Sequence, residues 1–242
     1  MIYLENLLST NRGVNTIQLT AVIDTALCVG AGGSSGSLAD KPIVRTADNK
    51  LLIPASQLKG RWRHECEKIA RGLGWKICQA PTPQTMCPQH AGLSKTEFER
   101  RDYYIEEDGR HHCLICQIFG NPAIPSRVDF DDLICEESPE NLPQEVIRPG
   151  VTINRRSRTA QEEKLFYLET SPANAKLRFS GQVYVQPEAP TCTKALLLAG
   201  LHHIHALGGS KSAGLGWLHW EHIEQFSINE EEWQSLLAGG TQ

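Results

Sequence analysis

The 242-residue chain lacks long apolar segments and has no excess of positive charge. Its longest apolar candidate, residues 195–201, is far shorter than the roughly 20 residues that a membrane-spanning helix needs. The first twelve residues contain no basic leader followed by an apolar stretch and a small-residue cleavage site. We therefore expect a cytoplasmic protein with no membrane partner.

Nucleotide-binding loops are also missing. Two Gly-rich segments, 30–36 and 208–216, lack both the Gly-Lys-Ser/Thr ending of a phosphate-binding loop and the glycine spacing of a dinucleotide-binding fold. Glycines also let a nucleic-acid backbone approach main-chain amides closely. Gly32 and Gly33 are therefore candidate nucleic-acid contacts, and flexible surface turns are the alternative.

The net charge of −4 hides an uneven distribution. Segment 41–76 carries nine lysines and arginines against three acidic residues, a local charge of +6, which leaves −10 on the rest of the chain. A basic surface on an acidic body can hold a phosphate backbone as well as a globally basic protein can. The alternative is that these basic residues are solvated side chains on a helix surface.

Hydrophobic periodicity predicts an α+β fold with a mostly antiparallel sheet. Strands are expected at 15–24, 127–135, 146–154, 175–185 and 217–226. Helices are expected at 57–73, with Ser56 as N-cap, and at 191–207 and 229–237. Segment 74–120 lacks this periodicity and is too long for an ordinary loop, so we expect a cross-link within the segment to stabilise it. We expect one domain, 1–242, with this segment as an insertion.

Four of the eight cysteines lie in that insertion. Disulfides are disfavoured in a reducing compartment, and two-residue spacers separate Cys87 from His90 and Cys113 from Cys116, so each pair can reach one ion. The predicted ligands of a structural zinc are Cys87, Cys113 and Cys116, with either Cys78 or His90. Four such ligands leave no position for a catalytic water. The alternatives are free buried thiols and, less favoured, a thiol-redox pair.

The segment IPASQLKGRWR, residues 53–63, resembles the I-P-G-S-S-L-K-G-x-x-R signature of the RAMP superfamily, which supplies backbone subunits of CRISPR effector complexes. Weaker matches follow the same order over about residues 15–220: the loop 30–36, Asp40-Lys41-Pro42, CQIFG at 116–120, Asn154-Arg155 with Thr159-Ala160 and Leu165-Phe166-x-x-Glu169, and the loop 208–216. The number and order of these motifs carry the resemblance. The chain departs from the signatures at Ala55, Gln57, Ile118 and Asn154.

The resemblance implies a modified ferredoxin-like (RRM-like) palm, zinc-containing fingers at about 74–120 and a β-hairpin thumb at about 145–165. Such subunits stack along a guide RNA, and each thumb kinks the guide–target duplex. The implied partners are CRISPR guide RNA, target RNA, and other backbone and large subunits of a type III complex that defends against foreign nucleic acid. The cysteine-rich insertion resembles those of type III-D and related effectors.

The resemblance also implies RNA contacts. The candidate residues are Gly32, Gly33, Ser56, Lys59, Arg61, Arg63, Arg155, Arg156, Arg158 and Lys211. Basic side chains in the first turns of a helix lie near its positive dipole end, where phosphate is favoured. Contacts of this kind position RNA without reading its sequence, which base pairing with the guide would do.

Asp40 is the candidate catalytic residue, because the resemblance implies cleavage of guide-paired target RNA that needs an aspartate here. A carboxylate can orient or deprotonate a ribose 2′-hydroxyl, or hold Mg²⁺ or Mn²⁺ at a phosphate. One alternative is a noncatalytic guide-binding scaffold, in which Asp40 only caps the turn at Pro42. The other, a guide-processing endonuclease, is disfavoured because such enzymes use a histidine in the N-terminal half and none precedes His64.

Overall fold

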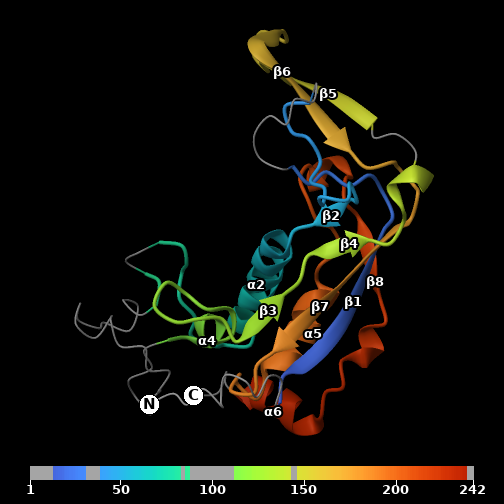
Figure 1. The fold of residues 1–242 in the computed structure, drawn as a ribbon. Helices are drawn as coiled ribbons and strands as arrows, with labels where there is room; N and C mark the ends of the chain where they lie inside the picture. Colours follow the sequence, from blue (N-terminus) through green and yellow to red (C-terminus); the bar gives the residue numbers. More distant parts are fainter. Residues whose placement is uncertain (1–12, 31–38, 83–84, 88–111, 143–145, 239–242) are drawn as a thin grey trace.

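A single antiparallel sheet organises the chain in the computed structural model, which describes residues 13–30, 39–82, 85–87, 112–142 and 146–238. Its six strands are β1 (Asn15–Ile23), β2 (Leu52–Ile53), β3 (Val128–Phe130), β4 (Leu133–Cys135), β7 (Leu177–Val185) and β8 (Leu218–Glu221). They lie in the order β2-β4-β7-β1-β8, and β3 also pairs with β7 (Figure 1). The predicted α+β fold with an antiparallel sheet is confirmed.

The pairing of β1 with β7 forms the centre of the sheet. It runs over nine residue pairs, from Asn15 opposite Val185 to Ile23 opposite Leu177. Side chains alternate along β7, so that Leu177, Phe179, Val183 and Val185 face the core. The sheet therefore has one buried face, which the helices must cover.

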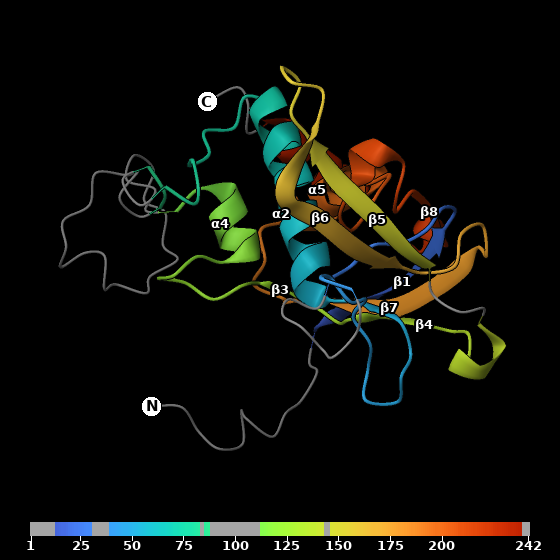
Figure 2. The same cartoon turned by 90° about the horizontal axis from the view of Figure 1, so that it is seen from above.

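The helices are α2 (Ala55–Gly72), α4 (Leu114–Phe119), α5 (Thr193–His202) and α6 (Glu230–Ala238), with 3-10 turns η2 (Pro139–Asn141), η3 (Lys211–Ala213) and η4 (Ile223–Gln225). Helices α2 and α5 lie together on one side of the sheet (Figure 2). Trp62 of α2 is fully buried, and its indole N–H donates to the Leu197 carbonyl at 2.8 Å. Among the described residues, no helix combines the length and apolar character needed to cross a bilayer.

A second, two-stranded sheet projects from the body of the molecule (Figure 1). It is a hairpin of β5 (Val146–Ile153) and β6 (Ala160–Thr170), with an irregularity between Val151 and Ile153. The hairpin lies where the family resemblance implies a thumb, and its action as a thumb stays a prediction.

Some predicted boundaries are wrong. The expected strand 127–135 is two strands, because the chain turns between Phe130 and Leu133. Ser56 is not the N-cap of α2: Pro54 occupies that position, and the Asp132 carboxylate accepts the Ala55 N–H at 2.6 Å. Helix α5 and strand β8 are both shorter than predicted.

Replacing Trp62 should be costly because the side chain is fully buried. We expect Trp62→Ala to lower the free energy of unfolding by about 3–5 kcal/mol, through lost packing and a residual cavity. For a chain of this size, that corresponds to a fall in Tm of roughly 6–20 °C. Trp217→Ala, at a side chain that is 50% exposed, is the matched control and should cost less than about 1 kcal/mol. Thermal unfolding followed by circular dichroism measures both variants, and equal losses would contradict the assignment.

Candidate metal centre and nucleic-acid interface

Four buried cysteines, Cys78, Cys87, Cys113 and Cys116, bring their sulfur atoms together. All four Sγ atoms lie within 4.8 Å of one another. The Sγ atoms of Cys78 and Cys116 are 3.5 Å apart. Sulfurs around a tetrahedral zinc, with bonds of about 2.3 Å, lie about 3.8 Å from one another. The cluster therefore fits a structural zinc site.

Short local elements position these sulfurs. Cys113 is the N-cap of α4 and Cys116 lies in its first turn, so the two-residue spacer directs both side chains to one point. The Cys113 N–H also donates to Cys87 Sγ at 3.2 Å. Cys78 supplies the fourth sulfur, whereas His90, the other candidate, lies outside the described residues. The geometry favours Cys78 as the fourth ligand.

Hydrogen bonding within the cluster separates the thiols into two groups. The bond with Cys116 lowers the pKa of Cys113 to about 7, and the bond with Cys113 lowers the pKa of Cys78. The bonds with Cys113 raise the pKa values of Cys87 and Cys116. Elsewhere in the core, burial raises the pKa of Cys192 to about 11, although hydrogen bonds partly oppose the shift. The four thiols therefore differ in how readily they lose a proton, and a bound Zn²⁺ would favour the thiolate form of each of them.

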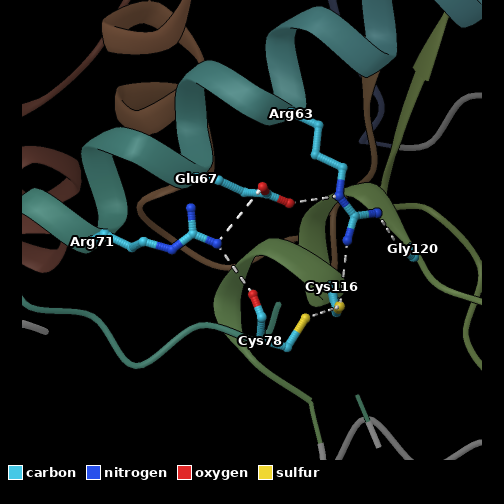
Figure 3. Close-up of polar contacts among 6 residues, drawn as sticks. All are labelled: Arg63, Glu67, Arg71, Cys78, Cys116 and Gly120. Carbon is cyan, nitrogen blue, oxygen red and sulfur yellow. Dashed lines mark hydrogen bonds and ion pairs between the residues drawn. The ribbon is translucent and has the colours of Figure 1, made fainter. Parts of the chain in front are cut away.

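Arg63 contacts this cluster from α2 (Figure 3). Its Nε donates to Glu67 Oε1 at 3.1 Å, its Nη1 donates to the Gly120 carbonyl at 2.9 Å, and its Nη2 lies 3.7 Å from Cys116 Sγ. Burial opposes the charge, but the bond to Glu67 and the nearby Cys116 outweigh it and raise the pKa of Arg63. All three nitrogens of the guanidinium have protein partners, so the predicted phosphate contact would compete with them.

The other RNA candidates on α2 differ in surroundings. Lys59 is half-buried, with its Nζ 5.9 Å from the centre of the Phe130 ring, and burial lowers its pKa. Arg61 forms an ion pair of 2.8 Å with the buried Glu65. Ser56 is exposed in the first turn. RNA binding by these residues stays a prediction.

Asp40 is tethered to the base of the hairpin. Its N–H donates to the Tyr167 carbonyl at 3.0 Å, and its Oδ2 accepts the Tyr167 N–H at 2.7 Å. The next residue, Lys41, bridges to Leu168, and its carbonyl accepts the Glu169 N–H at 3.2 Å. The Asp40 side chain is exposed, and among the described residues its Oδ1 has no hydrogen-bond partner. The structure thus presents one free carboxylate oxygen beside β6.

The second Gly-rich loop packs at the same end of the molecule. Gly208 has φ +88°, and a Cβ there would lie 2.5 Å from the Cys28 carbonyl oxygen, which also accepts the Gly209 N–H at 2.7 Å. Cys28 and Leu168 belong to one small apolar cluster, which joins this loop to the hairpin base. Lys211 is exposed and donates to the Gly208 carbonyl at 2.9 Å. Close approach of the chain to itself explains Gly208. Gly32 and Gly33 lie outside the described residues.

The hairpin carries both basic and apolar exposed side chains. Its tip is ordered by Asn154, whose Oδ1 accepts the Arg156 N–H at 2.9 Å and the Ser157 N–H at 3.3 Å. Arg155, Arg156 and Arg158 are all exposed. The exposed large apolar side chains are Val146, Ile147, Val151, Ile153, Leu165, Phe166 and Tyr167. Apolar surface gathered on one projection is typical of an interaction site.

Comparison with known proteins decides the family. A family model described as the RAMP superfamily matches residues 20–219. The chain belongs to the RAMP superfamily. It is also 26% identical over 219 residues to the "CRISPR system Cms endoribonuclease Csm3" of Methanocaldococcus jannaschii, an alignment that covers 82% of this chain and 75% of that relative. The resemblance seen in the motifs is confirmed at the level of the family.

Several contacts of this RAMP protein were not predicted. Arg63, Glu67 and Arg71 follow one another at intervals of four residues, which places them on one helix face, and this spacing was an available signal. The bond between Asp40 and Tyr167 joins residues 127 positions apart and has no local signal.

The metal site leads to a direct test. The purified chain should carry about one zinc ion, and Cys78→Ser should lose it because one of four soft ligands is removed. His90→Ala, the matched control, should retain the metal. Elemental analysis of freshly purified protein measures the zinc content. Metal-free wild-type protein, or loss of zinc only in His90→Ala, would contradict the assignment.

Proposed function

We propose that this RAMP protein is a guide-RNA-binding backbone subunit of a type III CRISPR complex and that it cleaves target RNA paired with the guide. The observation that carries the proposal is the attachment of the exposed Asp40 carboxylate to the base of the hairpin. The similarity to a protein named as a CRISPR endoribonuclease supports the reaction class. The cysteine-rich insertion supports a III-D-like subtype, and the ferredoxin-like palm belongs to the same proposal.

The proposed chemistry uses the free oxygen of Asp40. With Oδ2 held by the Tyr167 N–H, Oδ1 would accept the proton of a ribose 2′-hydroxyl or hold Mg²⁺ or Mn²⁺ at the phosphate. The 2′-oxygen forms a bond to the adjacent phosphorus while the bond to the 5′-oxygen breaks. The leaving 5′-oxygen takes a proton from water, so the products are a 2′,3′-cyclic phosphate and a 5′-hydroxyl. DNA has no 2′-hydroxyl, so the site would act on RNA.

Basic groups on the hairpin tip, the second Gly-rich loop and α2 would hold the RNA backbone. Exposed arginines at the hairpin tip and Lys211 in the second Gly-rich loop can contact phosphate, and arginine can do so with two parallel bonds. Lys59 on α2 would add a point charge. Such contacts fix the register of the RNA, while pairing with the guide determines which target is cut. Other backbone and large subunits would continue the same RNA path.

A noncatalytic scaffold is the second candidate, and one observation favours it. The Asp40 carboxylate already accepts a backbone N–H of β6, so the residue has a structural task without any RNA. In that case the protein would order guide and target RNA, and another subunit would do the cutting. The two candidates differ in whether Asp40 needs its charge or only a hydrogen-bond acceptor.

Asp40→Asn separates these roles, because the amide oxygen can still accept the Tyr167 N–H while the negative charge is lost. We expect Asp40→Asn and Asp40→Ala to reduce cleavage of a guide-matched RNA by the assembled complex by at least about 100-fold, the lower range for a lost general base. Guide and target binding should persist. Gel analysis of labelled target, with and without a divalent cation, measures cleavage.

Asp48→Asn is the matched control, because it removes the same charge from a nearby exposed turn. It should cleave as wild type does. A target with a 2′-deoxy sugar at the cut site should resist cleavage. Full activity of Asp40→Asn, in a complex with no other active backbone subunit, would assign the protein to the scaffold class.

The hairpin tip provides a second test. Deleting residues 155–160 should leave guide binding nearly intact but abolish the regular spacing of cleavage products, because the basic tip would no longer wedge the duplex. Replacing Arg155, Arg156 and Arg158 with alanine keeps the turn and removes only the charges. Product lengths on denaturing gels report the spacing. Unchanged spacing after the deletion would exclude this placement of the thumb.

A further inference from the structure

Helix α2 contacts the cysteine cluster at two points, one helical turn on either side of Glu67 (Figure 3). Arg63 lies against Cys116 Sγ, and Arg71 donates to the Cys78 carbonyl at 3.3 Å. Glu67 is between them, 3.1 Å from Arg63 Nε and 3.9 Å from Arg71 Nη2. One carboxylate thus orients the two cations that face the cluster.

We propose that Arg63 is a positioning residue of the metal centre, which stabilises zinc-bound thiolates and fixes the cysteine segment on α2. The inference rests on the metal site proposed above and goes beyond the RNA role expected for Arg63. Two of its three contacts span the last turn of α4, from the Cys116 sulfur to the Gly120 carbonyl. An N–H directed at a ligand sulfur is the kind of outer contact that orients ligands and tunes a bound metal.

Charge explains why a cation belongs at this position. Four thiolates and one Zn²⁺ together carry a charge of about −2, and each of these sulfurs belongs to a buried cysteine. Burying uncompensated charge is costly, so a nearby guanidinium stabilises the loaded site. Arg63 is well placed for this, because its side chain is only 23% exposed and is held by Glu67, whose side chain is 12% exposed.

The location of Gly120 supports the same assignment. Gly120 has φ +78°, and a Cβ there would lie 2.8 Å from the Ser126 nitrogen, so the chain turns tightly at the end of α4. The Gly120 N–H bonds to the Cys116 carbonyl at 2.9 Å, while its own carbonyl accepts Arg63 Nη1. Arg63 therefore links the segment that carries two of the cysteines to a helix packed deep in the core.

The test measures zinc affinity of the isolated full chain, without RNA, by competition with a chromophoric chelator. Arg63→Gln should lower zinc affinity by about 10- to 100-fold, the range typical for lost outer contacts of a metal site. Arg63→Lys keeps the positive charge but loses the several N–H donors of the planar guanidinium. Its zinc affinity should therefore lie between those of Arg63→Gln and wild type. Lys59→Gln, one turn earlier on α2, is the matched control and should bind zinc as wild type does.

A second readout separates metal tuning from simple stability. In the cobalt-substituted protein, Arg63→Gln should shift the sulfur-to-metal charge-transfer band, and the metal-free Tm should fall less than the metal-loaded Tm. Equal zinc affinity of Arg63→Gln and wild type, or an equal loss in Lys59→Gln, would overturn the role of Arg63. Wild-type chain that binds no zinc would overturn the metal site itself, and neither result depends on whether the complex cleaves RNA.

Discussion

The packing of α2 against α5 is the contact on which the rest of the structure depends. On the inner face of α2, Trp62 is fully buried in the core and donates a hydrogen bond to the α5 backbone. These contacts fix both the position of α2 and its rotation about the helix axis. The outer face of α2 therefore holds Arg63, Glu67 and Arg71 in fixed positions beside the cysteine segment. The described cysteines of the metal-binding segment can be held in place when they lie on such a support.

The candidate RNA site is organised differently, by contacts between distant parts of the chain. Asp40, the hairpin base at Tyr167 and the glycine loop at Gly208 come from three separate segments, yet they are joined by backbone bonds and one small apolar cluster. Each contact closes a long loop of the chain, which costs conformational entropy. Folding of the main sheet already brings the distant segments together and so offsets that cost. The position of the carboxylate is thus a property of the whole fold.

Local patterns in the sequence predict the elements well. The alternation in β1 and β7 and the spacing in α2 locate these elements within two residues, because each buries one face on the core. The cysteine spacers also predict the composition of the metal centre, yet they cannot choose between Cys78 and His90. The cap of α2 was mispredicted because a distant carboxylate, not the local Ser56, accepts its first N–H. Contacts between remote segments leave no periodic signal, so the tether of Asp40 was not predictable.

The stability of the β5–β6 hairpin affects the conformational entropy of Asp40, because Asp40 is bonded to the hairpin base. Two-stranded sheets are only marginally stable alone, and this hairpin exposes large apolar side chains over most of its length. We therefore expect the hairpin to be less stable locally than the six-stranded sheet, and to open while that sheet stays folded. Because Asp40 is bonded to its base, opening of the hairpin releases the carboxylate as well. Any partner that covers the exposed strands therefore also orders Asp40, and the conformational entropy of both is lost in a single step.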